Sequence, residues 1–382
     1  MRTLLFTFAS LASTLSAQDF LLYKFDSPCT NEVINHANGS GAFPANGTLA
    51  YNTPTAYQPG MFGGALSGGS AATNTYSRVD SGWSPAAQPM TGSITLAFWA
   101  KERTPVGTAL NYLCGCTSTG HRLFTNGVGG TGLYFRNIVA SGPNTLDLVL
   151  PAATTNFQAL ASAGWVHIAL VIDATAGTAD WYVNGTSAIH YTGVGPGLIN
   201  TAGNYLVGMQ LTTNECNYDL DEWLLSNRAY TSAEILGLSL VPRAGDGDYT
   251  SATPAQCGGG NVTLGSAGGA PYVGNLGYQL EVTATTPSLF LLLMGLDRCS
   301  YGGVIPLPLD GTPLLPILNG CWILTDAPVI LNGVAIGGPS PVPFPIPPSI
   351  STGIDVYSQV LALDIGTSAS SMSSGFVTST GL

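Results

Sequence analysis

The stretch GWVHIALVIDATAGTADWYVNG, residues 164–185, decides the fold. Its first half places apolar side chains on one face of an extended chain, which is the period of a half-buried strand, at Val166, Ile168, Leu170 and Ile172. A turn at residues 173–178 leads to a second strand through residues 181–183. Asn184-Gly185 then accepts the positive φ angles of a tight hairpin turn. The stretch therefore predicts a three-stranded antiparallel meander.

Strand patterns dominate the rest of the sequence. SITLAFWAK at residues 93–101 alternates in the same way, and towards the end of the chain QLEVTA, SLFLLLMGL, CWILT and VYSQVLALDI continue the pattern. The one convincing helix start is a capping box, in which Thr231 covers the amide of Glu234 and Glu234 reaches back. The Pro-rich residues 341–348 favour an extended edge or a polyproline segment. The expected fold class is all-β.

A change in composition divides the chain. Residues 241–260 contain Pro, Gly and small polar residues with little periodic apolar content, which is typical of a linker. The opening MRTLLFTFASLASTLSAQ places one arginine before an apolar run and a small-residue segment, as in a cleaved secretory signal peptide. We therefore expect four parts: a signal peptide at 1–17, a first β domain at 18–243, a linker at 244–256, and a Pro/Gly-rich β-sandwich domain at 257–382.

Charged side chains are scarce. Only 8% of residues are charged, and the formal net charge is −11. Nucleic acids and anionic membrane surfaces require clustered Lys and Arg, so we expect neither as a partner. The longest apolar segments are too short to span a bilayer, which argues against an integral membrane protein. The expected location is secreted, extracellular or in the cell envelope.

Such a compartment permits disulfides, and the chain has seven cysteines, so at least one is unpaired. Cys299 and Cys321 flank a Pro-rich loop and are the pair we favour. Cys114-Gly-Cys116 lacks the CxxC spacing of zinc knuckles, so a disulfide role is favoured over a metal role. The connectivity among these two cysteines, Cys29 and Cys216 stays open.

Motifs of common enzymes are absent or out of context. GxGxxG at residues 127–132 has neither the preceding strand nor the following helix that dinucleotide binding requires. The nucleophile elbow and HExxH do not occur. A retaining glycosidase needs two carboxylates about 5 Å apart, and the nearest set is Asp219, Asp221 and Glu222, without the ExDxxE spacing usual on jelly rolls. We therefore expect a protein that is not an enzyme.

Two groups of residues are candidates for binding. Asp26 and Asp221 are candidate calcium ligands, because calcium accepts loop carboxylates without strict geometry. The alternative is that these carboxylates hydrogen-bond loop amides and an arginine such as Arg228. The rings that could stack on a sugar are those in polar, Gly- and Pro-rich stretches, namely Tyr57, Tyr76 and Trp83. The tryptophans in strand patterns are expected in the core.

The order of segments resembles the laminin G-like (LamG) type of concanavalin A-like jelly roll. The resemblance covers roughly residues 19–240 and is carried by LLYKFD, SITLAFWAK, the hairpin at 164–185 and LDEWLLSNRAYTSAEI. It implies that Asp221-Glu222 lies in the last strand, beside the first strand, which would bring Asp26 towards Asp221. Members of this family mostly bind glycans, proteins or calcium. The end of the chain more distantly resembles Pro- and Gly-rich sandwich modules of secreted bacterial proteins.

Together these features predict a secreted, non-catalytic binding or adhesion protein. Its jelly roll is expected to recognise a glycan or an extracellular or cell-surface protein, with Ca²⁺ as the cofactor to test. One alternative is a structural protein of the envelope or matrix, which has no small ligand and associates with itself. The other is a glycoside-active enzyme on the same scaffold.

Overall fold

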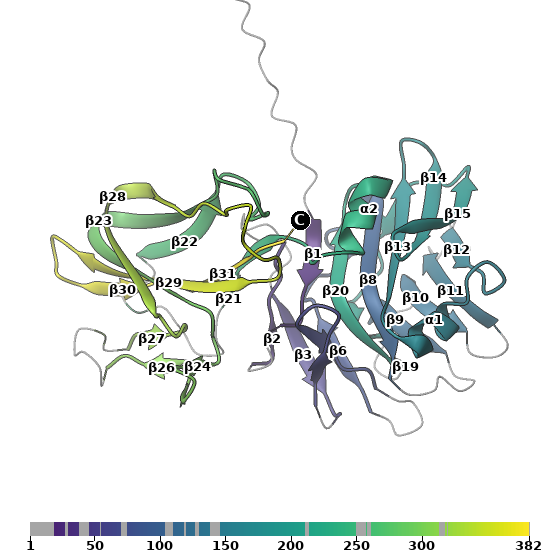
Figure 1. Cartoon of the computed structure of the whole chain (residues 1–382), viewed down its shortest axis with the longest axis horizontal. Coiled ribbons are helices and arrows are strands. Elements are labelled where there is room, and N and C mark those ends of the chain that lie inside the picture. Colours follow the sequence, from purple (N-terminus) through teal and green to yellow (C-terminus); the bar gives the residue numbers. More distant parts are fainter. Residues whose placement is uncertain are drawn as a thin grey trace, which may run out of the picture.

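The computed structural model describes residues 19–26, 30–37, 46–53, 55–69, 75–103, 110–117, 120–126, 130–137, 146–210, 214–249, 257, 261–312, 318 and 320–381. Two β domains lie side by side, with the N-terminal domain on the right in Figure 1. The predicted signal peptide at 1–17 and Cys29 fall outside the described residues.

The N-terminal domain is a sandwich of two eight-stranded sheets. The first has the order β15-β14-β13-β8-β20-β5-β4, with β1 paired to β20, and contains β1 (Asp19–Tyr23), β4 (Tyr57–Pro59), β5 (Gly64–Leu66), β8 (Ile94–Glu102), β13 (Val166–Asp173), β14 (Thr178–Val183), β15 (Thr186–Thr192) and β20 (Tyr218–Ser226). The second has the order β12-β11-β10-β9-β17-β6-β3-β2 and contains β2 (Glu32–Val33), β3 (Gly47–Tyr51), β6 (Ser77–Asp80), β9 (Asn111–Cys116), β10 (Arg122–Asn126), β11 (Gly130–Asn137), β12 (Leu146–Leu150) and β17 (Tyr205–Val207).

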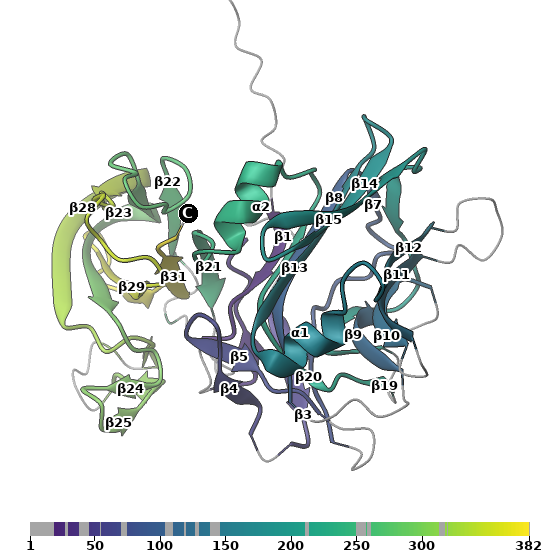
Figure 2. The ribbon, with the colours of Figure 1, turned by 45° about the vertical axis from the view of Figure 1, so that its right-hand side comes forward.

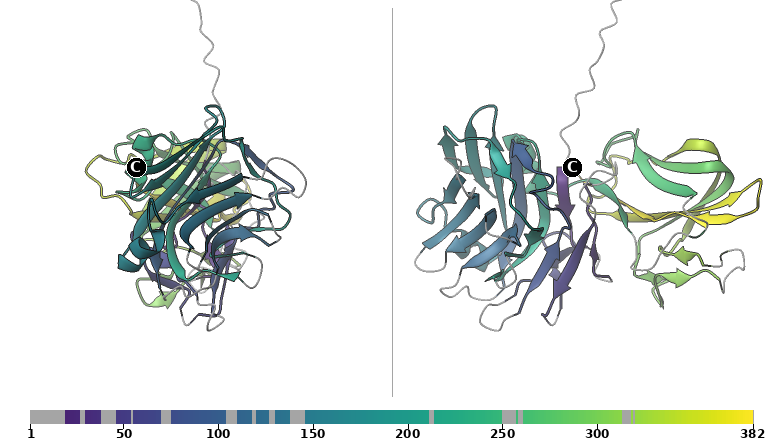
Figure 3. Two further views of the ribbon diagram at one scale, coloured as in Figure 1. Left: turned by 90° about the vertical axis from the view of Figure 1, so that its right-hand side faces the viewer. Right: turned by 180° about the vertical axis from the view of Figure 1, so that it is seen from behind.

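Short elements complete this domain. β7 (Met90–Gly92) pairs with β16 (Gly197–Ile199), and β18 (Met209–Gln210) pairs with β19 (Asn214–Glu215). α1 (Phe157–Ala163) contributes Phe157 and Ala161 to the core between the sheets. α2 (Ser232–Leu238) packs through Ile235 on the outer face of the first sheet, as Figure 2 shows. Neither helix of the described residues covers the outer face of the second sheet (Figure 3, left).

The predicted meander and helix are confirmed. β13 pairs with β14, and β14 with β15, both antiparallel. Asn184 and Gly185 have φ angles of 48° and 78°, as a tight hairpin turn requires. The α2 capping box is formed in both directions between Thr231 and Glu234.

The C-terminal domain is built on one seven-stranded antiparallel sheet that folds over its main apolar core. Its strands are β21 (Gly245–Tyr249), β22 (Val262–Ala267), β23 (Gln279–Gly295), β28 (Val329–Pro343), β29 (Asp355–Asp364), β30 (Ser370–Met372) and β31 (Gly375–Ser379). QLEVTA and SLFLLLMGL form the single strand β23, whose pairing with β28 shifts register between Ala284 and Pro287. Two hairpins lie below it in Figure 1: β24 (Ser300–Tyr301) with β25 (Ile305–Pro306), and β26 (Leu309–Asp310) with β27 (Trp322–Ile323).

Part of the predicted linker is a strand. β21, at residues 245–249, pairs with the last strand, β31, along its whole length. Apolar alternation does not predict this strand, because its sequence GDGDY consists mainly of small and acidic residues and has only one large apolar side chain.

The predicted pair Cys299–Cys321 is wrong, because Cys321 bonds Cys257 across a Cα–Cα distance of 4.8 Å. Cys257 and Cys321 share an apolar cluster with Leu307 and Leu318, whereas Cys299 pairs its carbonyl with the Leu307 amide in the β24–β25 hairpin. Cys299 is also disulfide-bonded, although not to Cys321.

The disulfide role favoured for Cys114 and Cys116 is also wrong. Both are free and buried in the N-terminal core, as is Cys216. The three thiols pack there as small apolar side chains. Burial raises the pKa of Cys116 and of Cys216 to about 12, so neither forms a thiolate readily.

The two domains are joined by a buried polar and apolar contact. The Asp246 amide donates to the His36 carbonyl (2.9 Å), and the Asn46 side chain donates to the Asp248 carbonyl (2.7 Å). Arg298 of the C-terminal domain, 6% exposed, lies 3.6 Å from Glu32 of the N-terminal domain. Ile34 packs into an apolar cluster with residues of the C-terminal domain, including Tyr357. The two domains are therefore in direct contact, and residues of both surround the space at their boundary.

Candidate functional site

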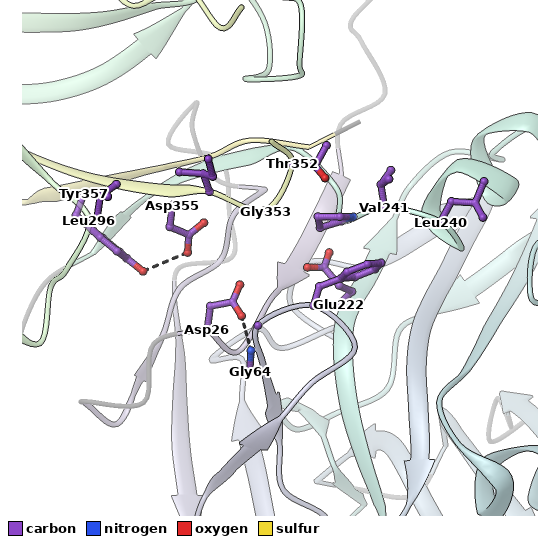
Figure 4. Close-up of a pocket in the computed structure, with 14 residues that line it drawn as sticks. Asp26, Gly64, Glu222, Leu240, Val241, Leu296, Thr352, Gly353, Asp355 and Tyr357 are labelled. Carbon is purple, nitrogen blue, oxygen red and sulfur yellow. Dashed lines mark hydrogen bonds between the residues drawn. The ribbon is translucent and has the colours of Figure 1, made fainter. Parts of the chain in front are cut away.

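A pocket of about 580 Å³ opens where the two domains meet (Figure 4). Three carboxyl side chains from separate segments line it: Asp26 just after β1, Glu222 in β20 and Asp355 at the start of β29. Phe62, Leu240 and Tyr357 are among the apolar side chains of the wall. Clefts at domain boundaries that combine apolar walls with a few converging polar groups are typical ligand sites.

The backbone around Asp26 is bent so that its side chain enters the pocket. Phe25, the residue before it, has a φ of 61°, which is unusual for a bulky side chain and is found where surroundings enforce it. The Gly64 amide donates to Asp26 Oδ1 (2.7 Å). Burial, followed by the nearby Asp355 and Glu222 carboxylates, raises the pKa of Asp26 to about 8. At neutral pH this carboxyl group is mostly protonated.

A β-bulge directs Glu222 into the pocket. The register of β20 against β8 shifts between Asp221 and Leu224, and Glu222 has a φ of 48°. Such an extra residue re-aims a side chain. Glu222 Oε1 lies 3.8 Å from the buried Lys24 Nζ and accepts no hydrogen bond, while Oε2 accepts from the Arg243 amide (3.3 Å). Burial raises the pKa of Glu222, and Lys24 opposes this shift.

Asp355 is held by the C-terminal domain. The Tyr357 hydroxyl donates to Asp355 Oδ2 (3.2 Å), and the Ser379 hydroxyl donates to Oδ1. Ser379 also lies 3.1 Å from His36 Nδ1 of the N-terminal domain, where burial lowers the His36 pKa. Among the described residues, Lys24 is the one basic side chain that forms an ion pair with any of the three acids. The pocket therefore has more carboxyl groups than cations.

Asp221 lies behind this pocket and holds its wall. Asp221 Oδ2 accepts from the amides of Met61 (2.8 Å) and Phe62 (2.9 Å), and Oδ1 accepts from the Glu222 amide (2.7 Å). Asp26 is close enough for its charge to raise the Asp221 pKa, after the larger effects of burial and Glu222. Asp221 in β20 and Asp26, just after β1, thus hold residues 60–64 from two sides through hydrogen bonds from backbone amides.

This arrangement matches the loop-amide alternative foreseen for Asp26 and Asp221. Arg228, the arginine named in that alternative, instead pairs with Glu234 at 2.8 Å. Within the described residues, no group of three or more His, Cys, Asp or Glu side chains is arranged to hold a metal ion. Calcium binding by Asp26 and Asp221 stays a prediction.

The aromatic residues predicted to stack on sugar do not line the pocket. Trp83 is 0% exposed, packs on Phe20 and Tyr205, and donates its indole N–H to the Gln88 carbonyl (2.9 Å). It has no free ring face, so the prediction for Trp83 is wrong. A Gly-rich sequence marked it as a loop residue, and the loop folds over the core.

Tyr57 and Tyr76 are half-buried. Tyr57 packs against the core and borders a cavity of about 10 Å³ beside Asp26, which has room for about one water molecule. Arg78 lies over the Tyr76 ring, 5.4 Å from its centroid. A binding role for these two tyrosines stays a prediction.

A row of rings crosses the uncovered face of the second sheet. Tyr112, Phe124 and Tyr134 stack across β9, β10 and β11 at centroid distances of 5.5 and 5.3 Å. Arg122 and Arg136 lie over the Phe124 ring. Phe124 and Tyr112 are each only 6% exposed, because the rings cover one another. Phe124 and Tyr112 therefore offer little open ring surface for a ligand.

Sequence reasoning singled out Asp26 and the pair Asp221-Glu222, but not Lys24 or Asp355. Lys24 is one of only two lysines in the chain, and its position two residues before Asp26 could have indicated that it belongs to the site. Asp355 lies more than a hundred residues beyond the N-terminal domain, and only the docking of the domains brings it to the site.

Residues 68–236 match the family model Laminin_G_3 of the concanavalin A-like lectin/glucanases superfamily. The N-terminal domain is therefore a jelly roll of the predicted LamG type. The resemblance of the C-terminal domain to modules of secreted bacterial proteins stays a prediction. No curated protein sequence matches the chain significantly. Neither helix in the described residues is long and apolar enough to cross a membrane.

The solved structures to which the chain is similar include three binding domains or modules. Domain 4 of AbnA, a GH43 extracellular arabinanase from Geobacillus stearothermophilus in complex with arabinotriose, is 16% identical, with a TM-score of 0.39 over 58% of this chain and 98% of that chain. The binding domain of Paraclostridial Mosquitocidal Protein 1 is 14% identical, with a TM-score of 0.42 over 71% and 65%. The botulinum neurotoxin type G receptor binding domain is 9% identical, with a TM-score of 0.41 over 95% and 79%. These likenesses are too distant to indicate a ligand.

Proposed function

We propose that the protein is a non-catalytic binding protein that acts outside the cell and that takes a carbohydrate into the pocket between its domains. The observation that carries this proposal is the meeting of three carboxyl side chains with apolar walls in one open cavity of about 580 Å³. The disulfides fit an oxidising compartment.

The chemistry of the wall favours a ligand rich in hydroxyl groups. Glu222 Oε1 has no hydrogen-bond donor of its own, and a buried acceptor without a donor is unfavourable. Asp26, mostly protonated at neutral pH, both donates and accepts. Phe62 offers a half-buried ring at the rim. Anionic ligands are disfavoured, because the pocket already has an excess of carboxyl groups.

Binding can be tested with the full chain on a glycan array, in buffer with calcium and in buffer with a chelator. Thr352→Arg would fill the pocket at its rim and place a cation among its acids. Thr263→Arg, on the exposed part of β22, is the matched control. We expect selective glycan hits, an affinity loss of about tenfold or more for Thr352→Arg, equivalent to about 1.4 kcal/mol, and no loss for Thr263→Arg.

The same assay separates the alternatives. The proposal fails if no glycan binds in either buffer, or if both arginine variants bind equally well. If a glycan binds in buffer with calcium but not in buffer with the chelator, the proposal is extended by a calcium ion at the Asp26 side of the pocket. Release of reducing ends from a bound glycan would contradict the non-catalytic part and favour a glycoside-active enzyme.

A further inference from the structure

The outermost strand of the C-terminal domain is apolar and exposed. Along β28, Ile330 is 57% exposed, Val334 52% and Ile336 82%. They share one face, because they are separated by even numbers of residues. Their cross-strand neighbours on β23 extend the surface, since Leu289 lies opposite Val334 and is itself 50% exposed. Soluble monomers rarely leave such a contiguous apolar surface uncovered.

β28 also has a free edge. In the described part of the chain it pairs with β23 and with no other strand. Figures 1 and 2 show it on the side of the C-terminal domain that faces away from the N-terminal domain. The edge therefore presents the backbone N–H and C=O groups of every second residue to solvent.

The two halves of this strand differ in how the edge is protected. Pro339, Pro341 and Pro343 occupy alternate positions of the second half, and Glu281 lies opposite Pro341. Prolines and charges are the usual means of blocking strand addition. Residues 329–336, VILNGVAI, contain neither a proline nor a charge. The first half is thus open to a further strand, and the second half is not.

We propose that residues 329–336 of β28 pair antiparallel with the same residues of a second copy, forming a twofold dimer with one sheet running through both C-terminal domains. An edge strand of this kind is complementary to itself about a twofold axis, so one uncharged segment supplies both sides of the contact. The lack of charge matters in a chain of net charge −11, because two copies can approach there without local repulsion.

The first test is the association state of the full chain by sedimentation velocity across a range of concentrations. We expect a monomer–dimer equilibrium that the double substitution Val334→Lys and Ile336→Lys shifts to monomer, with a dissociation constant at least about tenfold higher. Leu276→Lys, at another exposed apolar residue (68%), is the control and leaves the dimer intact. A wild-type chain that stays monomeric, or a dimer indifferent to the lysines, overturns the proposal.

The second test locates the contact. Asn332 is exposed near the centre of the segment, so Asn332→Cys is expected to cross-link to its own copy under mild oxidation. Ser340→Cys, in the proline-protected half, should not. The native free thiols that the structure describes are buried and stay out of this reaction. A dimer that the lysines dissociate but that Asn332→Cys cannot trap would overturn strand pairing. Neither test involves a glycan, so the outcome is independent of the pocket.

Discussion

Asp26 shows how burial changes the chemistry of a single side chain. Its pKa of about 8 arises because the group is largely removed from water and faces two other carboxylates. Between about pH 4 and pH 8 the folded chain keeps a proton on Asp26 that the unfolded chain has lost. The contribution of Asp26 to stability therefore falls as the pH rises through this window.

Asp26→Asn removes this dependence, because the amide has the shape of the neutral acid. We expect the melting temperature of the wild type to fall relative to that of Asp26→Asn as the pH is raised from 5 to 8. Melting curves at matched ionic strength measure this. The effects of titratable groups that do not interact with Asp26 are common to both proteins and cancel in the difference, whereas the shifts that Asp26 itself causes in its neighbours belong to the measured effect. If the difference between the two melting temperatures stays constant from pH 5 to pH 8, the raised pKa of Asp26 is contradicted.

Asp221 accepts three backbone N–H groups, and its removal leaves them unpaired. Asp221→Ala should lower the free energy of unfolding by about 3 kcal/mol, and Asp221→Asn by less. Asp180→Ala, at an exposed pair with His190, is the control and should change it by at most about 1 kcal/mol. Chemical denaturation measures all three. If Asp221 instead holds calcium, a chelator destabilises the wild type and leaves Asp221→Ala unchanged.

At the scale of elements, local patterns were predictive where the signal was complete within a few residues. The meander at 164–192 and the capping box at Thr231 are such cases. α1 was missed although Asn156 caps its start and Phe157 and Ala161 are buried one turn apart. A seven-residue helix offers too few positions for a period to stand out.

The capping box of α2 can be tested directly. Thr231→Ala removes the acceptor for the Glu234 amide and the partner of the Glu234 carboxylate. We expect a loss of about 1 kcal/mol in the free energy of unfolding. Thr192→Ala, at an exposed position in β15, serves as the control and should change stability by less than about 0.5 kcal/mol. Equal effects of the two substitutions would argue against a capping contribution.

Elements that depend on distant partners were not predictable. The Cys257–Cys321 bridge joins residues 64 positions apart, and its pairing depends on which loops fold over the same apolar cluster. Trp83 lies in a stretch with the composition of an exposed loop, yet Phe20 and Tyr205, from distant segments, enclose it. The candidate site combines both situations: two of its three acids, Asp26 and Glu222, lie in stretches of the jelly roll that the sequence singles out, and tertiary docking supplies Asp355.

At the scale of the molecule, we expect the contact around Arg298 to couple the unfolding of the two domains. Its guanidinium group donates to Thr30 Oγ1 and to the Glu32 carbonyl, and it lies over the Tyr249 ring. Because these polar contacts and a shared apolar cluster join the domains, one cooperative transition is the expected behaviour of the wild type.

Arg298→Met retains the apolar stem and removes the charge, leaving Glu32 partly buried opposite it. We expect a loss on the order of 3 kcal/mol and a separation of the calorimetric transition into two. Arg136→Met, which breaks an exposed pair with Asp147, should change stability by at most about 1 kcal/mol and keep one transition. If Arg298→Met unfolds in a single transition at the wild-type temperature, the coupling between the domains depends on other contacts.

The position of β28, on the far side of the C-terminal domain from the jelly roll, has a consequence for avidity. Because β28 and the pocket lie on opposite sides of the C-terminal domain, two copies joined through this strand would carry their pockets on opposite sides of the dimer contact, with a jelly roll at each end. Such a dimer could bridge two chains of a polysaccharide or two surfaces. A polymer that reached both pockets would be held about 100-fold or more tightly than a short oligosaccharide, without any additional contact in either pocket.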